Sequence, residues 1–231
     1  MSIPASLPGA EVALRVTSYN AHLNGLRPDK VTPYDLVRIV NEIDTDVLVL
    51  QEIDTGRDLG LPHLPHRSHL AVWVGDDHES GENLGVLIHS RYPILDTKFI
   101  KMPVVGRDPR RFAIMATIDS PIGIVNVIGV HLTTDVLPVG SFIQAASLAR
   151  QLPDGPLIIT GDHNLWGPVV AVTGFARRGM SRAVLGRTWP AHRPHSQIDH
   201  IWYRGLRSSN GHVLSDRGSD HLPVQAYFYK A

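Results

Sequence analysis

The chain contains no cysteine, no long hydrophobic run and no excess of charge of one sign. Without cysteine it cannot form a disulfide framework, a thiolate zinc site or a cysteine nucleophile, so any metal must be held by oxygen and imidazole ligands. No apolar run approaches the roughly 18 residues that a membrane span requires. With 22 basic and 22 acidic residues, the chain also lacks the basic surplus typical of proteins that bind nucleic acid through bulk charge.

The length of 231 residues suits one large domain, because sandwich and α/β folds commonly reach about 250 residues as a single unit. A chain of this size buries enough surface to fold without a disulfide or a structural metal. Since we find no repeat, linker or low-complexity stretch, we predict a single domain over residues 1–231, monomeric by default. The first thirteen residues lack a basic stretch followed by an apolar one, which predicts no signal peptide and a cytoplasmic location.

Short runs rich in valine, isoleucine and leucine recur along the chain and predict buried strands. Two segments instead show helical periodicity: one begins at Pro33 after the cap residue Thr32, and the other covers about 139–152. Hairpin-like strand pairs interrupted by few helices indicate two packed mixed sheets with helices outside. The expected strands cover 12–19, 46–52, 69–74, 84–89, 94–101, 112–119, 123–131, 157–161, 197–203 and 224–229.

Polar side chains stand repeatedly where an apolar run ends. Glu52 follows one such run after Gln51, Asp162 and Asn164 follow a second, and His131 ends a third. Each has an ordinary explanation when taken alone, since charges at strand ends, Asx turns and buried histidines are common. Their repetition favours an enzyme over a binding module, because α/β enzymes build their sites from side chains at a shared edge of strand ends.

The residue types at these positions suit phosphate chemistry with a hard cation. A carboxylate such as Glu52, fixed on a strand, is the kind of ligand that a partly hydrated Mg²⁺ requires, and the amide of Asn20 at the end of the first strand can complete the metal shell. Asp162 can orient a water molecule while Asn164 contacts a phosphate oxygen, because alternation along the chain directs both to one side.

Two Asp-His dipeptides near the end of the chain provide a candidate base and its orienting carboxylate. His221 follows Asp220, and Asp199 precedes His200. A carboxylate beside an imidazole fixes its tautomer and stabilises the imidazolium form. For His131 we expect Glu82, on a neighbouring strand, as the carboxylate partner.

Taken in order, these motifs resemble the endonuclease/exonuclease/phosphatase superfamily, over about residues 16–228. The resemblance implies a four-layer α/β sandwich of the deoxyribonuclease I type, and phosphoester hydrolysis by direct in-line attack of water with Mg²⁺, or alternatively Mn²⁺. The motifs are Tyr19-Asn20, Leu50-Gln51-Glu52, Val130-His131-Leu132, Gly161-Asp162-His163-Asn164, Ile198-Asp199-His200 and Ser219-Asp220-His221.

The resemblance also implies a role for each site residue. Glu52 is similar to the principal metal ligand, with Asn20 beside it and Asp220 as an additional acid on the metal side. His221 is similar to the general base supported by Asp199. The other expected roles are water orientation and phosphate binding by Asp162 and Asn164, assistance at the phosphate or leaving group by His131 with Glu82, and phosphate contact by Arg110 and Arg111.

Some features depart from this pattern or lie outside it. His163 stands where relatives usually carry an aromatic residue, often phenylalanine, and we interpret it as a packing change. Trp166 and Trp189 fall in loops near the motifs. Two roles are compatible with these positions, packing within the protein and stacking on a nucleic-acid base. The spacing of His63, His66 and His69 indicates a loop at the substrate rim; a second metal site there is the weaker alternative, since two prolines exclude a helix.

Three functions are open on the sequence alone. A nucleic-acid phosphodiesterase, with DNA favoured, is supported by the histidine pattern and by local arginine clusters. A phosphatase or phosphodiesterase for a small or lipid headgroup phosphoester is supported by the neutral net charge and the short chain. A non-catalytic scaffold predicts at least one broken motif, and no motif is broken.

Overall fold

The helices and strands form two layers of sheet covered on their outer sides. The computed structural model describes residues 11–22, 33–54, 59–69, 71–72, 84–107, 111–167, 169, 173–215 and 218–231. The elements are β1 (Leu14–Asn20), α1 (Pro33–Glu42), β2 (Val47–Asp54), β3 (His66–Arg67), β4 (Ala71–Val72), β5 (Leu84–Ser90), β6 (Ile94–Lys101), β7 (Phe112–Ser120), β8 (Gly123–His131), α2 (Val139–Arg150), β9 (Leu157–Asp162), η3 (Ala176–Arg178), β10 (Ser181–Arg182), β11 (Asp199–Arg204), β12 (Leu206–Val213) and β13 (Val224–Lys230).

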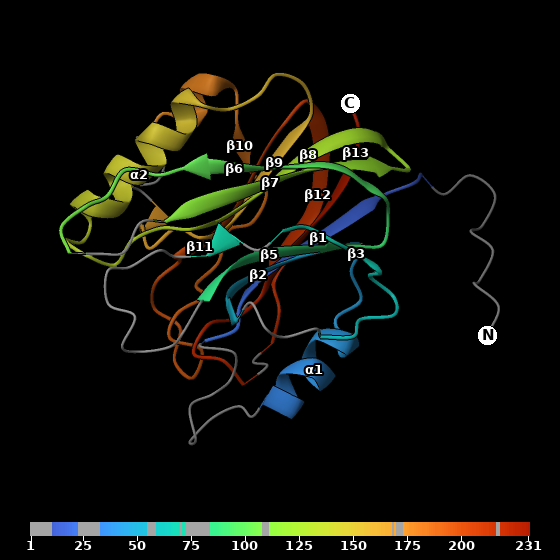
Figure 1. Cartoon of the computed structure of the whole chain (residues 1–231), viewed down its shortest axis with the longest axis horizontal. Coiled ribbons are helices and arrows are strands. Elements are labelled where there is room, and N and C mark those ends of the chain that lie inside the picture. Colours follow the sequence, from blue (N-terminus) through green and yellow to red (C-terminus); the bar gives the residue numbers. More distant parts are fainter. Residues whose placement is uncertain are drawn as a thin grey trace.

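Both sheets are mixed (Figure 1). The first has the order β12-β13-β1-β2-β5-β3, with β4 also paired to β5, and the second has the order β10-β11-β9-β8-β7-β6. In each sheet one central pair is parallel, β1 with β2 and β8 with β9, while the other pairs are antiparallel. The C-terminal ends of β1, β2, β8 and β9 therefore carry the polar residues that end the predicted strands.

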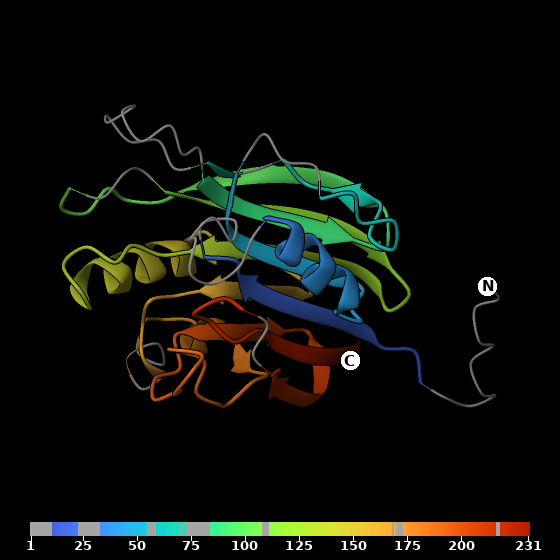
Figure 2. The same ribbon diagram turned by 90° about the horizontal axis from the view of Figure 1, so that it is seen from below.

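Successive side chains point to opposite faces of each central strand, so each strand contributes to two hydrophobic cores. In β8, Val125 and Val127 point into the core between the sheets, whereas Ile128 and Val130 belong to the core beneath α2. The apolar face of α1 packs in the same way on the outer side of β2 and β5. Figure 1 shows the resulting order of helix, sheet, sheet and helix, from α1 at the bottom to α2 at the top, and Figure 2 shows from below how α1 lies across the first sheet. The predicted pair of mixed sheets flanked by helices is confirmed.

The elements that differ from the prediction are short or polar. Of the strand expected over 69–74, the described residues include the two-residue β4, whereas Trp73 and Val74 lie outside them; β3, at residues 66–67, was not predicted. β12 was not predicted because its sequence, LRSSNGHV, is largely polar and lies at the edge of the sheet with a register shift. Among the described residues, no helix is long and apolar enough to cross a bilayer.

Candidate active site

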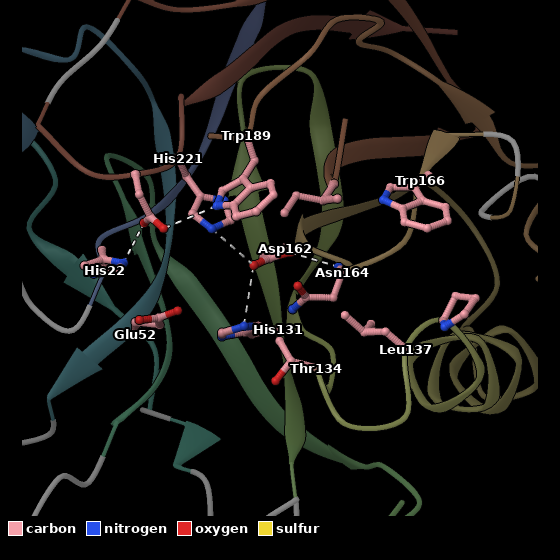
Figure 3. A pocket seen from close by; sticks show the side chains of 13 residues that line it. His22, Glu52, His131, Thr134, Leu137, Asp162, Asn164, Trp166, Trp189 and His221 are labelled. Carbon is pink, nitrogen blue, oxygen red and sulfur yellow. Dashed lines mark hydrogen bonds and ion pairs between the residues drawn. The ribbon is translucent and has the colours of Figure 1, made fainter. Parts of the chain in front are cut away.

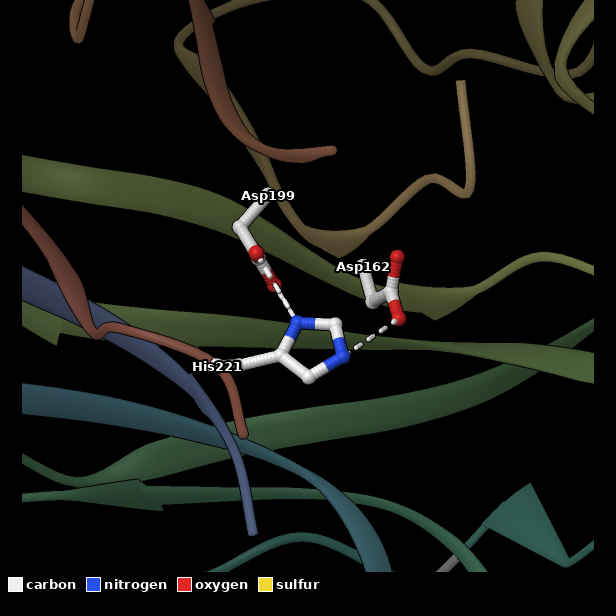
Figure 4. A group of neighbouring side chains, drawn as sticks. All are labelled: Asp162, Asp199 and His221. Carbon is white, nitrogen blue, oxygen red and sulfur yellow. Dashed lines mark hydrogen bonds and ion pairs between the residues drawn. The ribbon is translucent and has the colours of Figure 1, made fainter. Parts of the chain in front are cut away.

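A buried histidine and a buried aspartate are paired at the centre of the site. His221 precedes β13, and Asp199 begins β11. The Nδ1–H of His221 donates to Asp199, with Nδ1 3.0 Å from Oδ2 and 3.2 Å from Oδ1 (Figure 4). This contact leaves Nε2 as the proton acceptor of the neutral ring. The structure thus brings together the expected base and its expected orienting carboxylate.

A second carboxylate, Asp162, lies between two histidines. Its Oδ2 atom is 3.7 Å from His221 Nε2 and 3.5 Å from His131 Nε2. The parallel register of β8 and β9 places His131 directly beside Asp162, and the antiparallel register of β9 and β11 places Asp199 on its other side. Three strand ends therefore bring these side chains to one point, as the sequence pattern predicted.

The backbone after Asp162 turns sharply and brings Asn164 into the site. Asn164 has a left-handed conformation, with φ of 48°, and its N–H donates to Asp162 Oδ1 at 2.8 Å. One hydrogen of its amide group donates to the carbonyl of Leu132 at 2.9 Å. Before the turn, Gly161 has φ of 144°, and a Cβ at this position would overlap the carbonyl oxygen of Val130. Only glycine fits between β8 and β9 at this point.

Glu52 and Asn20 lie on the other side of Asp162. The amide of Asn20 donates to Glu52 Oε1 at 3.0 Å and to Asp162 Oδ2 at 3.1 Å. Glu52 stands at a bulge between Gln51 and Ile53, in a left-handed conformation with φ of 57°. Such a bulge re-aims one side chain, and here it directs Glu52 into the cavity.

Asp220 is held by two partners in the site. Its Oδ1 atom is 2.5 Å from His22 Nδ1, and its Oδ2 atom accepts from the indole N–H of Trp189 at 3.3 Å. The neighbouring Ser219 anchors this segment on β1, because its hydroxyl donates to the carbonyl of Asn20 at 2.7 Å. Asp220 and His221 are thereby fixed to the strand that carries Asn20.

His22 was not singled out from the sequence. It stands two residues after Asn20, beyond the end of β1, where strand alternation no longer applies, so no pattern in the sequence indicated that it enters the site. It lines the cavity and has φ of 49°.

These side chains surround a cavity of about 470 Å³ with unequal walls (Figure 3). One wall holds the carboxylates and imidazoles, and the other is apolar. No arginine or lysine is among the described residues that line it. The lining residues are His22, Glu52, His131, Thr134, Leu137, Pro138, Asp162, Asn164, Trp166, Trp189, Ile198, Asp220 and His221.

Burial and pairing set the charges of the central groups. Burial lowers the pKa of His221, but Asp199 and Asp162 outweigh it and raise that pKa to about 10. Burial raises the pKa of Asp162 above its ordinary value, although His221 opposes this change. Burial, followed by the charge of Arg111, holds the pKa of His131 well below its usual value. His131 is therefore neutral at pH 7, whereas His221 is an imidazolium in the metal-free protein.

The donor chemistry fits a divalent cation. Glu52, Asn20 and Asp220 provide the oxygen ligands that hard cations prefer. Asp162, Asp199 and His221 also present ligand atoms within 4.8 Å of one another. His221 and Asp199 of this group are already hydrogen-bonded to each other, whereas Glu52 and Asp220 line the oxygen-rich side of the cavity.

The remaining predicted residues lie at different distances from this centre. Arg111 is buried, and its Nη1 donates to the carbonyl of His131 at 3.5 Å, which places it behind the site. Glu82 and Arg110 lie outside the described residues. His163 is buried against Phe175, which agrees with a packing role.

The histidine-rich loop is separate from this cavity. Its residues His63, His66 and His69 are absent from the described lining. Within the described ranges they form no cluster of three metal ligands.

Comparison with known proteins finds a matching family and several solved structures with a similar fold. The model of the Endonuclease/Exonuclease/phosphatase family matches residues 17–221. An endonuclease/exonuclease/phosphatase structure from Beutenbergia cavernae shares 24% identity with a TM-score of 0.81, covering 95% of this chain and 72% of that one. Sphingomyelinase C from Streptomyces griseocarneus shares 19% identity with a TM-score of 0.68, covering 94% and 99%.

The catalytic domain of human Nocturnin, solved with a bound sulfate, shares 18% identity with a TM-score of 0.72, covering 96% of this chain and 97% of that one. These likenesses show a common fold. The family match spans most of the chain and includes all six strand-end motifs. The chain therefore belongs to the endonuclease/exonuclease/phosphatase family of hydrolases, with the deoxyribonuclease I-like fold.

Proposed function

We propose that the protein is a divalent-metal-dependent phosphoesterase in which the His221–Asp199 pair activates water for in-line attack at phosphorus. The observation that carries this proposal is the convergence of that pair with Asp162 and His131 at one wall of the cavity. A bound Mg²⁺ or Mn²⁺ on the Glu52 side supplies charge stabilisation at the phosphoryl and leaving oxygens.

Each side chain has a defined task in this mechanism. His221 Nε2 accepts the proton of the attacking water, and Asp199 stabilises the imidazolium that forms. Asp162 accepts a hydrogen bond from the same water and so orients its lone pair toward phosphorus. The amide of Asn164 has one hydrogen left for a phosphoryl oxygen, since the other is donated to Leu132. His131, neutral and adjacent, donates to the phosphate or to the leaving group.

The cavity favours a small phosphoester that carries an apolar or aromatic group. Leu137, Pro138, Trp166, Trp189 and Ile198 are its apolar lining, and a concave site of this composition is typical of small-molecule binding. Sphingomyelinase C, among the similar structures, is named for a substrate of this kind.

Arginines that cluster in the sequence, such as Arg178 and Arg182, give less support to a duplex DNA substrate than the sequence indicated. Arg178 donates to the carbonyl of Ala149 at 2.8 Å, and Arg182 donates to the carbonyl of Gly167 at 3.1 Å. Both guanidinium groups therefore brace loops of the protein itself.

A nucleic acid is the second candidate substrate, because Trp166 is exposed at the cavity and offers a face on which a base can stack. Such a substrate predicts a steep loss of affinity with salt, whereas a small phosphoester does not.

A substrate panel tests the proposal. Bis(p-nitrophenyl) phosphate, p-nitrophenyl phosphate and supercoiled plasmid are each incubated with Mg²⁺, with Mn²⁺ or with EDTA. We expect metal-dependent hydrolysis of the aryl diester that is insensitive to salt. Plasmid nicking that falls steeply with salt would instead favour the nucleic-acid candidate. An absence of hydrolysis on every substrate with either metal would contradict a phosphoesterase.

A further inference from the structure

Exposed apolar side chains gather at the mouth of the cavity. Of the eleven large hydrophobic side chains that are exposed among the described residues, five lie here, and we call them the apolar patch. They are Val136 (55% exposed), Leu137 (54%), Val139 (53%), Ile143 (42%) and Trp166 (54%).

The patch residues lie on neighbouring segments. Val136 and Leu137 precede α2, and Val139 and Ile143 lie one turn apart on its outer side. The hydroxyl of Ser141 donates to the carbonyl of Asn164 at 3.2 Å, which joins α2 to the segment that carries Trp166. Figure 3 shows Leu137 and Trp166 on the same side of Asn164 as α2.

The segment that carries most of the patch has no charge to hold it in water. Residues 136–149 contain no aspartate, glutamate, lysine or arginine. The inner side of α2 is buried through Ala145 and Leu148, and its outer side exposes Val139 and Ile143 to water. Exposed apolar side chains that are grouped in this way mark a site of contact with another molecule or a membrane.

Val136 is strained as well as exposed. Its φ is 52°, in the left-handed region that a β-branched residue rarely adopts and where asparagine or glycine is favoured. A polar asparagine would suit both this backbone and the contact with water. The presence of valine is therefore costly for the isolated protein and points to a contact that the side chain makes with something else.

We propose that the apolar patch docks on a phospholipid surface, so that the cavity faces the headgroup layer. A small soluble ligand inside the cavity leaves Val136, Val139 and Ile143 uncovered, since these three do not line it. A protein or a second copy of the chain on the patch would lie across the cavity mouth and obstruct the substrate. A lipid surface covers the patch and presents phosphoesters through the same contact. Both the choice of a lipid surface and its link to catalysis rest on the proposed function.

The test uses the full chain and vesicles of phosphatidylcholine. Val136→Asn combined with Val139→Ser removes two patch side chains outside the cavity, and asparagine relieves the strain at position 136. The matched control is Ile124→Ser, because Ile124 is 56% exposed at the opposite end of β8. Co-sedimentation is measured from about 0.05 to about 0.5 M salt, a range over which surface electrostatics are strongly screened.

We expect the wild type and Ile124→Ser to sediment with vesicles at all salt concentrations. The double variant should bind at least about tenfold more weakly, because each lost apolar side chain removes buried area from the contact. Its thermal midpoint should not fall. Three results would each overturn the docking: no binding by the wild type, equal binding by the double variant, or a wild-type dimer in solution that the double variant dissociates.

A second pair of measurements separates docking from catalysis. The double variant should hydrolyse soluble bis(p-nitrophenyl) phosphate at the wild-type rate and phosphatidylcholine in vesicles more slowly. Vesicle binding that depends on the patch, without hydrolysis of the soluble diester by any form of the protein, would support the docking while refuting the phosphoesterase. Hydrolysis of the soluble diester without vesicle binding would support the phosphoesterase and refute the docking.

Discussion

At the scale of single residues, the site depends on one imidazole held between two carboxylates. Asp199 is bonded to Nδ1 of His221, and Asp162 lies near Nε2. Together they raise the pKa of His221 to about 10 against the effect of burial. A base must be neutral to accept a proton, and a cation held on the Glu52 side would lower this pKa by repulsion. Metal binding there would thus make His221 available as a base.

Replacing Asp199 by asparagine should slow hydrolysis while keeping the fold. Asparagine can accept from Nδ1–H through one atom only, and in its other orientation it stabilises the wrong tautomer of His221. We expect kcat on bis(p-nitrophenyl) phosphate to fall by about 10⁴-fold, the loss seen when the orienting aspartate of a serine-protease triad becomes asparagine. Asp96→Asn, on exposed β6, serves as the control and should leave kcat unchanged. A kcat in Asp199→Asn equal to that of the control would remove Asp199 from the mechanism.

At the scale of elements, β9 determines how the site is assembled. It lies parallel to β8 and antiparallel to β11, so that Asp162 meets His131 on one side and Asp199 on the other. Gly161 permits the close approach of β8 that this arrangement requires.

Gly161→Ala should destabilise the protein by at least about 3 kcal/mol, because it adds an overlap with the Val130 carbonyl to the cost of an unfavourable φ. Gly123→Ala provides the comparison: φ is 107° there, but nothing lies within 4 Å of the added methyl group. It should cost only about 1 kcal/mol. Urea unfolding gives the free energy of unfolding of both variants. Equal losses would show that the close approach of the two strands is unimportant.

Two buried histidines brace the loop that follows β9. His163 donates from Nδ1 to the carbonyl of Gly161 at 3.0 Å, and His200 donates from Nε2 to that of Leu165 at 2.9 Å. Their rings are in edge-to-face contact, with centroids 5.2 Å apart. Burial lowers the pKa of His163 to about 4 and the pKa of His200 well below its ordinary value. Both rings are therefore neutral in the folded protein at pH 7.

These shifts predict loss of stability in acid. The unfolded chain binds protons at these histidines below about pH 6.5, whereas folded His163 does so only near pH 4. The contribution of these two histidines to folding stability should thus be full above about pH 6.5 and decline as the pH falls toward 4, by up to about 3 kcal/mol for His163 alone. His163→Phe should flatten this decline, and exposed His192→Gln should not. Urea unfolding across this range measures the effect. A slope that His163→Phe leaves unchanged would exclude His163 as its source.

The sequence was sufficient to predict the central strands but not the sheet edges. Runs such as Val47–Leu50 are buried on both faces, so their composition alone indicates strands. β12 is polar because it lies at an edge, and β3 and β4 are only two residues long. Edge pairing depends on which backbone groups the neighbouring strand leaves available, and this information is not contained in a local pattern.

At the scale of the whole molecule, the site joins segments that are distant in the chain. Asn20 and Asp162, for example, are 142 positions apart and are hydrogen-bonded. Strand-end residues were predictable as site candidates because apolar runs end there. The distances between these residues, the two partners of Asp220 and the apolar wall of the cavity were not predictable. They depend on how two sheets and several loops pack together. His22 escaped notice for the same reason.

The central claim is metal-dependent hydrolysis in which His221 is the base. Its most direct test is kcat on bis(p-nitrophenyl) phosphate for the wild type and for His221→Asn, with saturating Mg²⁺ or Mn²⁺ and with EDTA. We predict that EDTA abolishes turnover and that His221→Asn lowers kcat by about 10² to 10⁴-fold with the fold intact, the range expected for loss of a general base. Wild-type turnover that survives EDTA, or a His221→Asn variant that is as active as the wild type, would contradict the account.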